Sequence, residues 1–205
     1  MKSKKIIWLV PSIKNTLEES YKQSLEKCNI FIDLYCYRNK IIEKGYKGFI
    51  YDLKRTCRNS DLVLFTLWSG SHLLSPKLMK DIKKNSKVVL MAVDDEIYST
   101  SQSIYYANSV DLIVTTDFFG KGLYEQIGIK TIYFPFPRYD LPCANLKESK
   151  LIDVSFIGNI HTADRKKYIN FLSRNGIDIQ VYGVGSKNGE INREEYISII
   201  KNSKI

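Results

Sequence analysis

Short apolar runs alternate with amphipathic stretches along the first 137 residues of the chain. Most of these runs are continuous rather than alternating, which is typical of parallel strands that are covered on both faces. We predict strands over residues 6–10, 30–37, 62–67, 88–93, 112–116 and 131–134, and helices over residues 17–27, 46–58, 76–84, 96–108 and 120–126. The repeated alternation predicts an α/β fold with a doubly wound, Rossmann-like parallel sheet of about six strands.

The pattern breaks after the last of these strands. Pro135, Pro137 and Pro142 stand in an irregular polar segment that can carry neither a strand nor a helix far. We therefore predict an N-terminal domain over residues 1–137, a linker over residues 138–150, and a second domain over residues 151–205.

The second domain begins with a new strand–helix–strand–helix pattern. Thr162 stands where a helix N-cap belongs, and Asn192 with Glu195 three residues later has the pattern of a capping box. A further strand is expected to start at residues 203–205. Two strands and two helices cannot bury their faces as an independent doubly wound domain. We therefore interpret this βαβα unit as incomplete and the chain as truncated.

Composition narrows the class of protein. An apolar share of 44% and a charged share of 26% are ordinary for a soluble globular protein. No apolar stretch is long enough for a membrane span, and the run at residues 6–10 is too short for a signal peptide, so a cytoplasmic location is expected. The cysteines show no C-x-x-C spacing, and we expect them to be small buried hydrophobes; they stand at positions 28, 36, 57 and 143.

The formal charge of +9 is compatible with a nucleic acid, an anionic membrane surface or a phosphate-bearing ligand. The lysines are mostly single or in short groups between acids and apolar residues, as on solvated helix faces. No arginine-rich helix, aromatic RNA-binding pair or zinc finger stands in the sequence, so nucleic acid is not expected. A weak contact with an anionic membrane surface stays open.

One motif of the second domain points to a phosphate. The sequence Ile-Gly-Asn-Ile-His, residues 157–161, joins a predicted strand to a helix that contains Arg165. A strand, a glycine and a helix N-terminus together present bare backbone N–H groups and the positive end of the helix dipole. Gly183 and Gly185 follow the next strand and would let a ligand approach the backbone. The alternative is a plain turn, capped by Asn159 or Thr162, with Arg165 facing solvent.

This stretch resembles the opening of the second domain in GT-B glycosyltransferases of the group 1 subfamily related to the spore maturation protein CgeB. The likeness rests on Val-Ser-Phe-Ile-Gly-Asn at residues 154–159, Arg165 early in the helix, and Val-Tyr-Gly at residues 181–183 with Gly185 just after. It covers about the last fifty residues closely and the first 150 only in architecture.

The resemblance implies transfer of a sugar from a nucleotide-diphosphate sugar to an acceptor hydroxyl, without a cofactor. The donor would be held by residues of the second domain, namely Gly158, Asn159, His161, Arg165, Gly183 and Gly185. Because this domain is interpreted as incomplete, we expect little or no transferase activity from the chain alone.

Candidate acceptor-side residues follow two strands of the first domain, because ligands of open parallel sheets gather at the carboxyl ends of the strands. His72 is a candidate general base after the third strand, or simply a solvated side chain. Asp94 and Asp95, followed by Glu96, could serve as a base, position an acceptor or bind a divalent ion. One of them could instead cap the next helix. We predict catalytic roles for Asp94, Asp95 and His72 and no bound metal.

Two other interpretations stay open. A non-catalytic α/β module that binds a small ligand would use the same strand ends. A nucleotide-dependent enzyme of another class is less favoured, because the loop from Val10 to Asn15 contains no glycine. That loop is therefore neither a P-loop nor a G-x-G-x-x-G turn.

Overall fold

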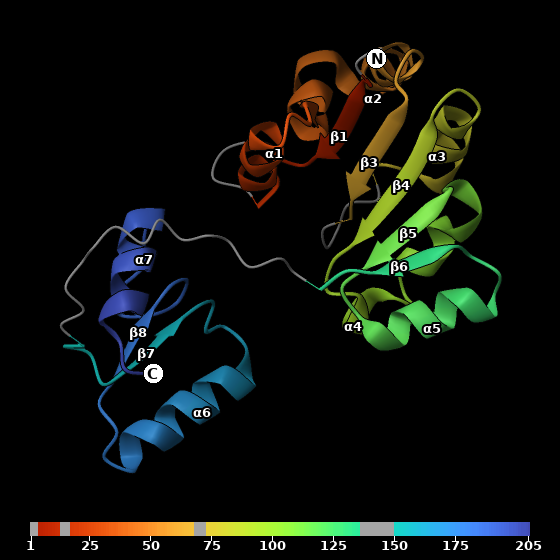
Figure 1. Cartoon of the computed structure of the whole chain (residues 1–205). Helices are drawn as coiled ribbons and strands as arrows, with labels where there is room; N and C mark the ends of the chain where they lie inside the picture. The colour runs from red at the N-terminus through yellow and green to blue at the C-terminus, as the bar shows by residue number, and fades with distance from the viewer. Residues whose placement is uncertain (1–3, 13–16, 68–72, 136–149) are drawn as a thin grey trace. The chain divides into compact units, whose positions relative to one another are not determined.

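The computed structural model describes residues 4–12, 17–67, 73–135 and 150–205. The chain forms two compact units, unit 1 (Met1–Pro137) and unit 2 (Arg138–Ile205), and each is described by itself (Figure 1). Most of the predicted linker, residues 138–150, lies outside the described residues.

The sheet of unit 1 has the order β2-β1-β3-β4-β5-β6, and every neighbouring pair is parallel. The predicted Rossmann-like α/β fold is thus confirmed, with each strand within two residues of its predicted bounds. The strands are β1 (Ile6–Val10), β2 (Ile32–Cys36), β3 (Leu62–Thr66), β4 (Lys87–Ala92), β5 (Leu112–Thr115) and β6 (Thr131–Tyr133).

Two helical predictions for unit 1 differ from the structure. The second helix begins at Tyr37 rather than Tyr46, and Gly45, at φ 67°, kinks it near its middle. The predicted helix over residues 96–108 is split, and the run Ser-Thr-Ser-Gln-Ser at residues 99–103, where it breaks, is rich in residues of modest helix propensity. The helices are α1 (Leu17–Lys27), α2 (Tyr37–Cys57), α3 (Pro76–Lys83), α4 (Asp95–Tyr98), the 3₁₀ helix η1 (Ser103–Ser109) and α5 (Phe118–Gln126).

The helices are distributed unequally over the two faces of this sheet. The larger core joins β1, β3, β4 and β5 to α2, α3, η1 and α5, with Phe49, Met79, Tyr106 and Tyr124 among its buried side chains. The smaller core lies on the other face, where α1 packs over β1 and β2 around Trp8. Right-handed crossovers explain the imbalance, since only the step from β1 to β2 runs toward that edge of the sheet.

Unit 2 contains two parallel strands and two helices: β7 (Val154–Ile157), α6 (Ala163–Arg174), β8 (Ile179–Tyr182) and α7 (Arg193–Asn202). Residues 203–205 run parallel to the start of β7, with a bridge between Ile152 and Ser203 and a bond from Lys204 N–H to the Ile152 carbonyl (2.8 Å). At residues 203–205, where a further strand was expected to start, the structure therefore has an isolated bridge rather than a strand. The capping box of α7 is present, with Asn192 and Glu195 bonded reciprocally.

Candidate functional site

The carboxyl ends of β7 and β8 stay paired beyond the strands themselves. The Gly158 N–H donates to the Tyr182 carbonyl (2.9 Å), and the Ile160 N–H donates to the Val184 carbonyl (3.0 Å). This pairing holds the 158–161 turn against the loop that follows β8. The two glycine motifs of the sequence therefore meet in one corner of unit 2, at the sheet edge where ligands of α/β folds gather.

Two glycines of the second motif are required by this contact. Gly183 has φ 111°, and a Cβ there would lie 2.4 Å from the Gly158 carbonyl oxygen. Gly185 has φ 82°, and a Cβ there would lie 2.8 Å from Cε1 of the His161 ring. Both positions therefore need a residue without a side chain because another part of the corner already occupies the space.

Arg165 and Asn159 complete the corner. One guanidinium nitrogen, Nη1 of Arg165, donates to the Asn159 carbonyl (2.8 Å), so the first turn of α6 is tied back to the turn before it. The remaining N–H groups of this exposed guanidinium are donors that could face an anion. All six predicted donor-binding residues are thus brought together. Whether they bind a donor stays a prediction.

The expectation that this turn offers bare backbone N–H groups is wrong for most of it. The amides of Gly158 and Ile160 are used in pairing with β8, and the His161 N–H donates to Oδ1 of Asn159 (2.8 Å). The amide donors that point out of the corner are instead those of the first turn of α6. Thr162 occupies the N-cap position there, but its side chain makes no capping hydrogen bond.

The charges around this helix N-terminus are mixed. Arg165 and Lys166 are exposed cations in the first two turns, and the exposed Lys187 belongs to the loop after β8. Asp164 adds a negative charge to the first turn, and its carboxylate lies 3.5 Å from Nζ of Lys167, both side chains being exposed. Glu190 is a second exposed carboxylate, in the loop after β8, so the corner has four cations against two carboxylates and a net positive charge.

In unit 1, the two predicted catalytic acids have different environments. Asp94 is exposed and adopts the left-handed conformation, with φ 54° and ψ 36°. It stands at the N-cap of α4, but its side chain makes no capping bond, so the capping alternative does not hold for it. A non-glycine residue in this conformation costs free energy, and such positions are enriched at functional sites. Of the two aspartates, Asp94 remains the candidate catalytic carboxylate.

Asp95 is fully buried and bonded to protein groups. Its carboxylate accepts hydrogen bonds from Oγ1 of Thr115 (2.8 Å) and from the Tyr124 hydroxyl (2.8 and 2.9 Å). This carboxylate ties the start of α4 to β5 and α5. Its location favours a structural role, because a group with no exposed surface cannot meet an acceptor hydroxyl. His72 lies outside the described residues.

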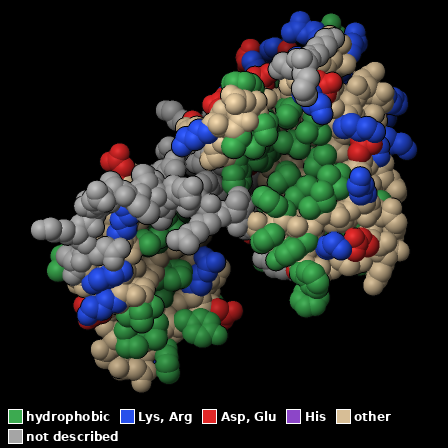
Figure 2. Space-filling view, in the orientation of Figure 1, with side chains coloured by type: hydrophobic (Ala, Val, Ile, Leu, Met, Phe, Trp, Pro, Cys, Tyr) green, Lys and Arg blue, Asp and Glu red, His purple; other side chains and the backbone are tan. Residues whose placement is uncertain are grey.

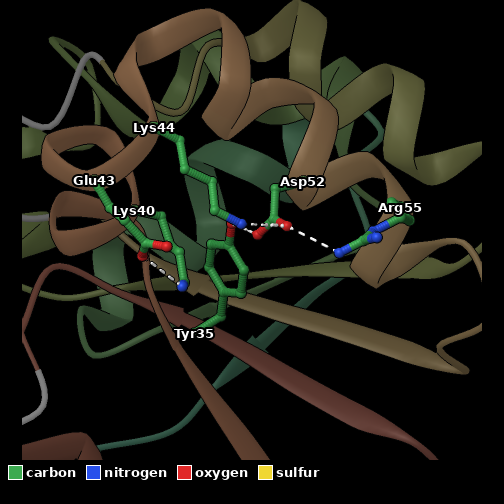
Figure 3. Close-up of polar contacts among 6 residues, drawn as sticks. All are labelled: Tyr35, Lys40, Glu43, Lys44, Asp52 and Arg55. Carbon is green, nitrogen blue, oxygen red and sulfur yellow. Dashed lines mark hydrogen bonds and ion pairs between the residues drawn. The ribbon is translucent and has the colours of Figure 1, made fainter.

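A polar cluster between β2 and α2 was not found by sequence reasoning. The buried Asp52 carboxylate accepts from the Tyr35 hydroxyl (2.9 Å), Lys44 (2.8 Å) and Arg55 (3.3 Å), as Figure 3 shows. The hydrogen bond from Lys44 makes the largest contribution to a lowered pKa of Asp52, and the Tyr35 hydroxyl and the Arg55 charge lower it further. The only sequence signal was Gly45, because its kink lets Lys44 reach a residue eight positions on. With three donors on one carboxylate, the cluster fixes α2 on β2.

The cysteine prediction holds for two of the three cysteines that the structure describes. Cys36 and Cys57 are buried, and burial raises the pKa of the Cys57 thiol to about 12, which makes it unreactive. Cys28 is exposed, at the end of α1, so the prediction is wrong for it.

Among the described residues, no group of three His, Cys, Asp or Glu side chains could hold a metal ion. In the same part of the chain, no helix has the length and apolarity needed to span a membrane.

Comparison of the sequence with protein-family models and with curated proteins gives no match.

Proposed function

We propose that this chain is a glycosyltransferase of the GT-B type, or a part of one, that transfers a sugar from a nucleotide-diphosphate sugar to an acceptor hydroxyl. The observation that supports the proposal most strongly is the corner of unit 2. Six residues singled out from two separate motifs lie together there, next to an uncapped helix N-terminus and an exposed arginine.

In the proposed reaction, unit 2 holds the donor diphosphate. The first-turn N–H groups of α6 and the guanidinium of Arg165 would bind its oxygens, because both are oriented donors with positive charge. Gly183 and Gly185 let the loop after β8 lie close against the Gly158 carbonyl and the His161 ring, so both glycine motifs border the proposed diphosphate site. These same donors would stabilise the negative charge that develops on the departing diphosphate.

Asp94 of unit 1 is the proposed general base. Its exposed carboxylate would take the proton of the acceptor hydroxyl while the acceptor oxygen forms a bond to the anomeric carbon. The bond from that carbon to the diphosphate breaks, and the nucleoside diphosphate leaves with the electron pair. The scheme needs no redox cofactor, since no electron is gained or lost overall.

Nucleotide titrations of the whole chain test this proposal. UDP and GDP should bind more tightly than the matching nucleosides, because only the nucleotides carry a diphosphate. Arg165→Gln should weaken nucleotide binding by about 1.5–3 kcal/mol, roughly 10- to 150-fold, through loss of a charge-assisted hydrogen bond. Nucleoside binding should not change.

Arg174→Gln is the matched control. Arg174 is an exposed arginine of the same helix, nine residues further on, so it lies about 13 Å along the helix axis from Arg165. The control variant should bind nucleotides like the wild type. Equal nucleotide affinity in all three proteins, or equal affinity for nucleotide and nucleoside, would overturn the proposed diphosphate site.

A further inference from the structure

The sheet of unit 1 has an apolar face that no described helix other than α1 covers. Parallel register places Thr66, Met91, Val114 and Ile132 in one row across β3, β4, β5 and β6 on this face. Figure 2 shows hydrophobic side chains gathered over the strands of this unit. Between α1 and this face lies a recess with a volume of about 410 Å³.

One wall of the recess is aromatic and fixed. The rings of Trp8 on β1 and Tyr21 on α1 are stacked, with centroids 6.0 Å apart and an interplanar angle of 11°. The indole N–H of Trp8 donates to Oγ1 of Thr66 (3.1 Å), so this polar group of the wall is satisfied within the protein. What the wall presents to the recess is therefore largely apolar surface.

The size of the recess matches a small molecule better than a helix. Pockets for small ligands span roughly 300–1,000 Å³ and are lined mostly by apolar and aromatic side chains. Two turns of a helix, about 10 Å wide and 11 Å long, fill on the order of 850 Å³. The recess offers about half of that volume, since it measures about 410 Å³.

The lining also selects by charge. Glu18, in the first turn of α1, is 1% exposed and is the only charged residue among the described residues that line the recess. No lysine or arginine stands among the described residues that line the recess, although the net charge of the chain is +9. Burying an anion beside these residues would therefore cost free energy, whether the anion is a fatty acid or an anionic lipid surface. The lining is compatible with a neutral, largely apolar ligand.

The position of the recess points to function. Thr66, Val93, Thr116 and Phe134 line it, and they stand at the carboxyl ends of four neighbouring strands. Asp94, the exposed candidate base, directly follows Val93. We propose that this recess binds a small neutral molecule with an apolar body, such as a phenol or a long-chain alcohol. The role of this molecule as the sugar acceptor rests on the proposed transferase function. Its binding to the recess is independent of that function.

Fluorescence of Trp8 gives a direct assay in the whole chain. The chain has two tryptophans, and replacing the other, Trp68, by phenylalanine leaves Trp8 as the reporter inside the recess. The probes are naphthol, which is neutral and carries a hydroxyl, and naphthalenesulfonate, which has the same rings and a negative charge. Naphthol should quench Trp8 saturably, and naphthalenesulfonate should bind at least tenfold more weakly.

One variant and one control test the location. Val114→Phe fills the recess and should weaken naphthol binding at least fivefold, whereas Ile42→Phe adds the same ring at a position that is 84% exposed on α2 and should have no effect. Thermal unfolding of each variant confirms that it is folded.

Three outcomes would overturn the assignment: equal naphthol binding in wild type and Val114→Phe, naphthalenesulfonate binding as tight as naphthol binding, or Trp8 quenching that rises with protein concentration without any probe. The last outcome would assign the face to a second copy of the chain. Naphthol binding without nucleotide binding would keep this site and remove the transferase proposal. Nucleotide binding without naphthol binding would remove this site and keep the transferase proposal.

Discussion

Replacing Tyr124 by phenylalanine removes one donor from the buried Asp95 carboxylate and leaves the ring in place. The Tyr124 hydroxyl lies 2.8 and 2.9 Å from the two carboxylate oxygens, and neither side chain has exposed surface. A hydrogen bond to a buried charged group stabilises a protein by about 1.5–3 kcal/mol. We therefore expect Tyr124→Phe to lower the free energy of unfolding of unit 1 by that amount.

Asp95→Ala should cost more than Tyr124→Phe. It leaves the hydroxyls of both Tyr124 and Thr115 buried without this acceptor, and each such group costs about 1–3 kcal/mol. Once Asp95 is alanine, removal of the Tyr124 hydroxyl should no longer destabilise the protein. The double variant should thus be more stable than the sum of the single effects predicts, by about 0.5–3 kcal/mol.

Urea unfolding followed by tryptophan fluorescence measures these changes. Both tryptophans of the chain, Trp8 and Trp68, belong to unit 1, so the signal reports the unit that contains Asp95. Strictly additive effects would show that Asp95 and Tyr124 do not act together. An unchanged free energy of unfolding in Asp95→Ala would refute the structural role and restore Asp95 as a candidate base.

Three further variants test individual contacts. Gly183→Ala should destabilise unit 2 in circular-dichroism melts far more than Gly189→Ala, because both glycines have positive φ but only the Gly183 Cβ would meet backbone, at 2.4 Å from the Gly158 oxygen. Asn192→Ala should cost about 1 kcal/mol in the same melts through loss of the capping box. Asp52→Asn should destabilise unit 1 near neutral pH. Since the folded pKa of Asp52 is lowered, its contribution is present above the unfolded pKa and is lost as the pH falls through the folded value, so pH-dependent urea unfolding should show the two proteins converging in acid.

The sheet of unit 1 could be predicted because its strands are continuous apolar runs bounded by turn residues. The start of α2 could not be predicted, because its first residue, Tyr37, continues the apolar run of β2, and Gly45 interrupts the helical pattern. The split between α4 and η1 falls in a run of serine and threonine residues, whose modest helix propensity apolar periodicity does not register.

The sequence could predict which residues lie in the candidate site, but not which backbone N–H groups there are available as donors. The glycines at positions 183 and 185 stood out in the sequence, and the structure gives each a steric reason. That the Gly158 and Ile160 amides would be used by β8 depends on strand pairing beyond the strand ends, which no local pattern encodes. The burial of Asp95 depends on Tyr124, 29 residues away, so sequence alone could not separate Asp95 from Asp94.

Backbone amide chemical shifts of the whole chain during titration with UDP test the central proposal most directly. If unit 2 binds the donor diphosphate, the largest shifts should fall on the first turn of α6 and on residues 183–187, and uridine should leave the α6 amides unchanged. Shifts confined to unit 1, or equal shifts with UDP and uridine at α6, would contradict the assignment of this corner as the donor site.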